Sequence, residues 1–195
     1  MKNEEISLHT KKALSQSLKK AMEKKPFSKI TVSELIKDCN INRNTFYYHF
    51  SDIYSLLKWM FEQEAIDVVK KINLLLDTEE AIRFVMNYID NNKHIINCAY
   101  DSIGHKEMKR FFYTDFIGVM QNVIDSGEKK LGITIDPQFK EFLASFYTEA
   151  LAGSLITWLK DPHQIDKEEA IQMTHFNCQN TIPQLLNQKA KQETL

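Results

Sequence analysis

Residues 31–50 read TVSELIKDCNINRNTFYYHF, and this stretch predicts two short helices joined by a tight turn. Thr31 and Glu34 have the T-x-x-E spacing of a capping box, in which each residue bonds the backbone amide of the other, so a helix is expected to begin here. Residues 40–42, with the sequence NIN, interrupt the helical pattern with side chains that favour turns, and Asn42 is placed to cap the second helix. The stretch therefore has the form of a helix-turn-helix.

The second of these helices separates its apolar and polar side chains. At 100° per residue, Phe46, His49 and Phe50 fall on one side, whereas Asn44 and Tyr48 lie opposite. A short helix with long hydrogen-bonding and aromatic side chains on its outer face suits insertion into a DNA major groove. The same pattern also fits an ordinary helical hairpin in a protein that does not bind DNA, so the stretch alone leaves both interpretations open.

The composition of the 195 residues favours an all-α protein, because glycine and proline are rare, at 5 and 4 residues. Three cysteines that lie far apart in the sequence indicate neither a disulfide framework nor a zinc site, and no metal or other cofactor is expected. The first residues lack the apolar core of a signal peptide, and no run approaches the roughly 18 apolar residues of a membrane span. We therefore expect a cytoplasmic protein that does not bind membranes.

The charge is unevenly distributed, although the formal net charge is only −1. Residues 1–50 contain ten Lys or Arg and five Asp or Glu, a balance of +5. The remaining residues contain fifteen Lys or Arg and twenty-one Asp or Glu, a balance of −6. This asymmetry is expected of a protein whose first part approaches phosphates while the rest does not.

A basic amphipathic helix, expected from about Ser7 to Lys24, precedes the helix-turn-helix, and its lysines are candidates for contact with the DNA backbone. Together with residues 26–57, PFSKITVSELIKDCNINRNTFYYHFSDIYSLL, it resembles the N-terminal DNA-binding domain of TetR-family transcriptional regulators. The resemblance implies a three-helix DNA-binding module at residues 1–50 and a larger helical ligand-binding and dimerisation domain at residues 51–195.

The resemblance also assigns eight residues to DNA contact. Thr31 and Ser33 are expected at phosphates. The recognition helix contributes Arg43, Asn44, Thr45, Tyr47, Tyr48 and His49. Physically, Arg43 can pair with guanine or phosphate, Asn44 with an adenine edge, and Thr45 and Tyr47 with phosphates. Tyr48 is the first choice for base contact because it points away from the packed side, whereas for His49 packing and DNA contact both remain open.

The chain departs from the family pattern at two places. In the turn, Cys39 and Asn40 stand where relatives usually have a small residue and glycine, and asparagine tolerates the left-handed conformation that such a turn needs. Three residues after Phe50, where relatives often have a lysine for the phosphate backbone, this chain has Ile53. Lys58 is the next lysine along the sequence.

The rest of the chain predicts further helices. A long helix from Ile53 is expected to lead into the second domain. Helices are also expected at 137–160 and 167–189, the first with Phe139, Phe142, Leu143, Phe146 and Ala150 on one side, and the second kinked or shortened by Pro183. This pair suits an intermolecular four-helix bundle, the dimer interface usual in TetR-like regulators, although a purely intramolecular core fits too. Residues 146–161 resemble the C-terminal domain of a TetR subgroup that includes regulators of dihydroxyacetone kinase operons.

Residues 94–116 are rich in aromatic side chains and have no clear period, so they fit either a ligand pocket or plain core. His94 with Cys98, and His175 with Cys178, have spacings that could share a metal. No third ligand is indicated for either pair, so no metal site is expected.

The sequence thus predicts a homodimeric repressor that binds a pseudo-palindromic operator in double-stranded DNA and responds to a small-molecule or protein effector. The alternative is a helical protein–protein interaction module that does not bind DNA. An enzyme is not expected, because the sequence has no nucleophile elbow, phosphate-binding glycine loop or H-E-x-x-H motif, and no catalytic residue can be assigned. Neither the effector nor the operator sequence can be inferred from the residues.

Overall fold

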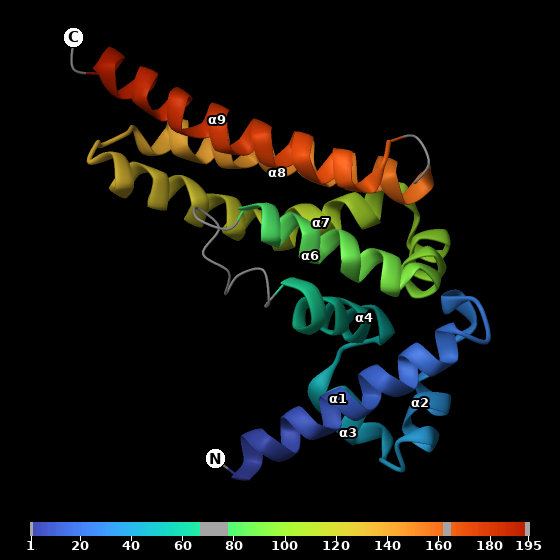
Figure 1. The fold of residues 1–195 in the computed structure, drawn as a ribbon. Helices are drawn as coiled ribbons and strands as arrows, with labels where there is room; N and C mark the ends of the chain where they lie inside the picture. Colours follow the sequence, from blue (N-terminus) through green and yellow to red (C-terminus); the bar gives the residue numbers. More distant parts are fainter. Residues whose placement is uncertain (1, 67–77, 162–164, 194–195) are drawn as a thin grey trace. The chain divides into compact units, whose positions relative to one another are not determined.

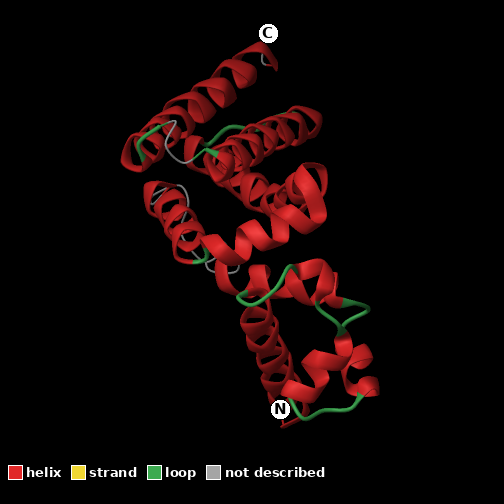
Figure 2. Ribbon diagram, turned by 90° about the vertical axis from the view of Figure 1, so that its right-hand side faces the viewer, coloured by secondary structure: helices red, strands yellow, loops and turns green. Residues whose placement is uncertain are grey.

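The computed structural model describes residues 2–66, 78–161 and 165–193, and every regular element in these ranges is helical (Figures 1 and 2). The predicted all-α class is confirmed. Contacts divide the chain into two compact units, which we call the amino-terminal unit (1–64 with 92–104) and the carboxy-terminal unit (65–91 with 105–195). The first unit, as defined by contacts, thus extends past residue 50. The predicted functional boundary at residue 50 stays a prediction.

The amino-terminal unit is built from short helices around α1 (Figure 1). Its elements are α1 (Lys2–Met22), a 3-10 turn (Phe27–Lys29), α2 (Val32–Asp38), α3 (Arg43–His49), α4 (Ile53–Phe61), a π-helical turn (Glu62–Ile66) and the first part of α7 (Lys93–Leu131). The long helix expected from Ile53 therefore ends as an α-helix at Phe61, and its expected continuation over 67–76 lies outside the described residues.

The core of this unit forms where α1 packs against α2 and α4. Leu14 and Leu18 of α1 are fully buried, as are Phe46 of α3 and Leu56 of α4. Phe27 and Ile30, which are apolar residues in a connection, are buried as well. Burial of these large apolar side chains stabilises the three-helix module and fixes the orientation of α3.

Side chains of the first part of α7 contact backbone carbonyls at the end of α1 and just after it. His94 Nε2 lies 3.2 Å from the Met22 carbonyl oxygen, and Cys98 Sγ donates to the Lys25 carbonyl at 3.6 Å. Burial raises the pKa of the Cys98 thiol. Among the described residues, no group of three or more His, Cys, Asp or Glu side chains could hold a metal.

The carboxy-terminal unit contains α6 (Thr78–Asn91), the second part of α7, α8 (Pro137–Lys160) and α9 (Lys167–Glu193). The backbone of α7 leaves helical geometry at Gly104, where φ is +79°. Asp136 caps α8 by accepting from the amides of residues 138 and 139, and Pro137 follows at the first helical position, as predicted. Pro183 was predicted to kink or shorten the last helix; the helix is not shortened there, because α9 continues through Pro183 to Glu193.

The core of this unit lies between α7, α8 and α9. Its centre contains Ile124, Leu143, Tyr147, Ile182 and Leu186, and the hydroxyls of Tyr147 and Thr181 share a hydrogen bond within it. Among the described helices, α8 alone has the length and hydropathy of a possible membrane span, with 33% of its most apolar window buried. Helices of soluble proteins meet the same two criteria, so this observation by itself does not predict a membrane protein.

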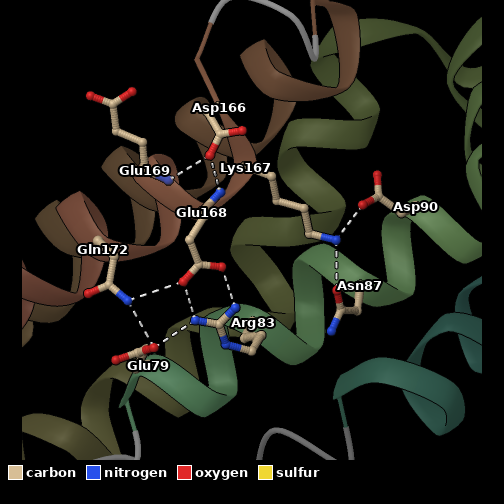
Figure 3. Close-up of polar contacts among 9 residues, drawn as sticks. All are labelled: Glu79, Arg83, Asn87, Asp90, Asp166, Lys167, Glu168, Glu169 and Gln172. Atoms are coloured by element: carbon tan, nitrogen blue, oxygen red, sulfur yellow. Dashed lines mark hydrogen bonds and ion pairs between the residues drawn. The ribbon is translucent and has the colours of Figure 1, made fainter.

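An ion-pair cluster joins α6 to the first turn of α9 (Figure 3). Arg83 on α6 donates to both carboxylate oxygens of Glu168 on α9, each at 2.5 Å, and to Glu79 at 2.7 Å. Gln172 donates to both of these carboxylates, at 3.0 Å and 3.3 Å. A bidentate arginine–carboxylate pair fixes the relative orientation of its two side chains, so this cluster sets the register of α6 against α9.

The cluster predicts a pH-dependent difference between the wild type and Glu168→Gln. The bonds from Arg83, followed by the bond from Gln172, lower the pKa of Glu168 from 4.5 to about 2. Because the folded-state pKa is depressed, the stability that this carboxylate contributes is fully present above about pH 4.5 and is lost as the pH falls through 2. We expect a small loss of unfolding free energy in the variant at neutral pH, since the pair is exposed.

Urea unfolding of both proteins at several pH values measures this difference. The gap between the two unfolding free energies should narrow as the solution is acidified. A gap that stays constant down to pH 2 would show that the charge of Glu168 does not contribute.

Candidate nucleic-acid interface

The turn and caps of the helix-turn-helix form as the sequence predicts. Thr31 Oγ1 accepts from the Glu34 amide at 3.4 Å, and Glu34 Oε2 accepts from the Thr31 amide at 2.9 Å. Asn40 adopts a left-handed conformation with φ +52°, and Asn42 Oδ1 accepts from the Thr45 amide at 2.8 Å. Local side-chain bonds therefore fix where α2 and α3 begin.

The buried side of α3 is formed by Phe46, which is fully buried, and by Phe50, which directly follows the helix. Tyr48 lies opposite and is 82% exposed, the largest exposed fraction among the described large apolar and aromatic side chains. Asn44 is also exposed. The predicted division of the helix into a packed side and an outer side is confirmed, and the outer side carries the two side chains predicted to read bases.

Arg43 and Tyr47 form a pair at the edge of this outer side. The Arg43 guanidinium lies 5.8 Å from the centre of the Tyr47 ring, within the range of a cation–π interaction, and both side chains are exposed. The ring restricts the guanidinium while leaving its N–H donors available. An arginine held in this way loses less conformational freedom when it binds a phosphate or a guanine.

His49 is the last residue of α3, and its side chain contacts α1. It is half-buried, its Nδ1 is 3.5 Å from Ser7 Oγ, and its ring packs edge-on against Tyr48 at 4.9 Å. Partial burial, and then the nearby charge of Lys11, lower the pKa of His49 below its usual value of 6.5. The shift favours the neutral form of the His49 ring, and the assignment of His49 to DNA contact stays a prediction.

The two threonines predicted to contact phosphates already have hydrogen-bond partners. Thr31 Oγ1 lies 3.1 Å from Glu34 Oε2, and the Thr45 hydroxyl donates to Asn42 Oδ1 at 3.0 Å. A phosphate oxygen only accepts, so either hydroxyl must leave its present partner to donate to DNA. Ser33, which is also predicted to contact a phosphate, is exposed at the start of α2.

Several lysines of this unit are held by contacts that the sequence does not reveal. Lys11 lies over the rings of Phe50 and Trp59, at 6.0 Å and 5.8 Å from their centres. Lys19 pairs with Glu64, and Lys25 pairs with Glu34. The exposed lysines for which the described residues supply no ion pair are Lys12, Lys20, Lys24, Lys29 and Lys37. These five are the better candidates for phosphate contact.

The position at which relatives often have a lysine is the half-buried first residue of α4, Ile53. Lys58, one and a half turns further along α4, lies 3.6 Å from Glu62 Oε1. The charge of Lys58 is thus partly compensated by Glu62. Lys58 would have to give up this contact to replace the missing lysine at a phosphate.

Comparison with known proteins places both parts of the chain among transcriptional regulators. Residues 18–60 match the family described as bacterial regulatory proteins, tetR family, and residues 77–179 match the family described as transcriptional regulator C-terminal region. The chain is 23% identical over 151 residues to the HTH-type dhaKLM operon transcriptional activator DhaS of Lactococcus lactis subsp. lactis (strain IL1403), covering 77% of this chain and 80% of that protein. A solved structure, the dihydroxyacetone kinase operon activator DhaS, has the same fold, with a TM-score of 0.65 at 19% identity over 93% of this chain and 98% of that one.

Proposed function

Because the chain belongs to the TetR family of DNA-binding transcriptional regulators and is not an enzyme, we propose that it acts as a cytoplasmic homodimer that binds a pseudo-palindromic operator. The observation that carries this proposal is the exposed outer side of α3, with Tyr48 and Asn44 opposite the fully buried Phe46. Two copies of α3 related by a two-fold axis would read half-sites one helical turn, about 34–36 Å, or a multiple of it apart.

Dimerisation is proposed to use α8 and α9, which expose large apolar side chains in the single chain. Phe142 and Phe146 on α8 are 63% and 58% exposed and stack on each other, and Met173 and Phe176 on α9 are 55% and 70% exposed. Exposed apolar clusters of this kind are typical of interaction surfaces. A second copy offers the same side chains, so a two-fold interface would bury them against one another.

We further propose that an effector bound to the carboxy-terminal unit changes operator affinity. Such an effector acts only through a difference in its affinity for the DNA-binding and non-binding conformations. Repression is predicted because it is the usual role in this family. Activation is the second candidate, because the DhaS sequence and the DhaS structure to which the chain is similar are both named as activators. A reporter gene placed behind the identified operator separates the two.

The decisive test is selection of binding sites from random duplexes with the purified full chain. An enriched inverted repeat would support the proposal. If no sequence is enriched even at low salt, the alternative of a helical protein–protein interaction module is favoured. The same selection repeated with candidate effectors shows whether any of them changes the enrichment.

Thr45→Ala tests the predicted phosphate contact separately from base reading. We expect affinity to fall by a similar factor for operator and random DNA, because phosphates carry no sequence information. The loss should be modest, about 1 kcal/mol per half-site, since a single hydrogen bond is removed. Fluorescence anisotropy with both duplexes measures it, and a loss confined to the operator would count against the phosphate role.

A further inference from the structure

The described residues of α6, α7, α8 and α9 bound a cavity of about 940 Å³ in the carboxy-terminal unit. One face of α7 runs along it at helical spacing, from Phe116 through Val119 and Val123 to Lys130. The facing residues of α6 are Ala81, Ile82, Val85 and Met86. The wall is therefore mainly apolar, and it ends in a lysine.

The cavity is long relative to its volume. The stretch from Phe116 to Lys130 rises about 21 Å along α7, at 1.5 Å per residue. The lining stretch of α8, from Glu149 to Asp161, rises about 18 Å. A ligand that fills this space must be elongated and must present apolar surface along most of its length.

The charged side chains of the lining differ in their partners. Glu149 lies 2.5 Å from Lys109 Nζ, and Asp161 also has an interaction partner. Lys130 is exposed to water and forms no ion pair with any residue that the structure describes. Among the three charged lining residues, Lys130 is therefore the positive one, and it is exposed at the end of the α7 face.

We propose that this cavity binds a single-chain amphipathic carboxylate, with its chain along the α7 face and its carboxylate at Lys130. The chain gains from contact with the apolar wall, while the carboxylate stays in water and next to a cation, which avoids the cost of burying an unpaired charge. A triose would leave most of the wall unfilled and its hydroxyls unpaired. This inference depends on the proposed function in one respect, namely that the bound carboxylate is the effector of the regulator.

The length of the cavity sets the length of the chain. An extended polypeptide advances about 3.6 Å for three backbone bonds, or about 1.2 Å per bond. At the same advance per bond, a ligand chain of about 17 bonds spans about 20 Å. Titration of the full chain with straight-chain carboxylates of six to sixteen carbons, below their aggregation limits, should show affinity rising about fourfold per added methylene. Dihydroxyacetone is the contrasting ligand and should not bind. Affinity independent of chain length, or binding of the triose alone, would contradict the proposal.

Lys130→Ala tests the head group. Its affinity for every carboxylate should fall about two- to fivefold, as expected for an exposed ion pair, whereas affinity for the alcohol of the same length should not change. The matched control is Lys129→Ala, because Lys129 is the adjacent exposed lysine and does not line the cavity. Equal losses in the two variants, or an equal loss for the alcohol, would remove Lys130 from the site.

Val123→Phe tests the path of the chain, because Val123 lies midway between Phe116 and Lys130 on the lining face. A ring at this position should block the part of the cavity between Val123 and Phe116. Affinity for the carboxylates should then stop rising at a chain length of about eight carbons. An unchanged chain-length series would place the ligand elsewhere, for example on the exposed side of α8. If the variant does not fold, as judged by helicity, the wild-type series and the two lysine variants still decide.

Operator binding is measured on the same protein preparations. Operator binding without carboxylate binding contradicts the cavity proposal and leaves the regulator function standing. Carboxylate binding without operator binding contradicts the regulator function and leaves the cavity proposal standing.

Discussion

We expect Tyr48→Ala to weaken operator binding by about 30- to 1,000-fold and to leave binding to random DNA nearly unchanged. The estimate follows from about 1–2 kcal/mol per half-site for a lost base contact, doubled because a dimer presents two copies of α3. Tyr48 is 82% exposed, and its ring packs edge-on against His49, so its removal should not unfold the module. Fluorescence anisotropy at fixed salt, with the selected operator and a scrambled duplex, measures both affinities.

Two further variants show what the side chain contributes. Tyr48→Phe removes only the hydroxyl, so it separates hydrogen bonding to a base edge from apolar contact with a thymine methyl. Asn44→Ala provides the comparison from the same outer side of the helix. If Tyr48→Ala lowers affinity for the scrambled duplex as much as for the operator, then Tyr48 contacts the DNA backbone and does not read bases.

The features that the sequence predicted best depend on short-range bonds. The capping box of Thr31, the caps by Asn42 and Asp136 and the left-handed Asn40 all involve residues within a few positions of one another. The opposite placement of Phe46 and Tyr48 follows from helical spacing alone once the helix is known to begin at Arg43.

The features that the sequence did not predict depend on contacts between distant parts of the chain. Arg83 and Glu168 are 85 residues apart, and nothing in either local sequence indicates their pairing. The lysines of α1 were candidates for contact with the DNA backbone, whereas Lys11 lies over the rings of Phe50 and Trp59. Neither partner could be identified before the packing of α1 against α4 was known.

The sequence also could not sort the apolar residues of α8. One side was predicted to hold Phe139, Phe142, Leu143, Phe146 and Ala150, but the structure buries Leu143 and exposes Phe142 and Phe146. A helix that is apolar on all sides has no clear period to show which side faces the core. The exposure of the two phenylalanines is the observation that gives the dimer proposal its specific residues.

A double substitution, Phe142→Glu with Phe146→Glu, should convert the proposed dimer to a monomer of 22.8 kDa at micromolar concentration. In a two-fold interface each substitution occurs twice, so four carboxylates would be buried or brought together where four rings had packed. Burying polar groups without partners costs about 1–3 kcal/mol each in proteins, so the dimer dissociation constant should rise at least about 1,000-fold. Sedimentation equilibrium measures the mass, and circular dichroism checks that the helices persist.

The matched control is Ile6→Glu, which places the same charge on a side chain of α1 that is 62% exposed, close to the 63% of Phe142. This variant should remain dimeric.

The double variant should also lose operator affinity. Two separate monomers must bind the two half-sites in independent events, whereas in a dimer the second binding event is intramolecular. Binding of the double variant to a single half-site should be unchanged. A double variant that stays dimeric would place the interface elsewhere on the chain. If instead the wild type binds lipid vesicles and the double variant does not, the exposed side of α8 would be assigned to a membrane.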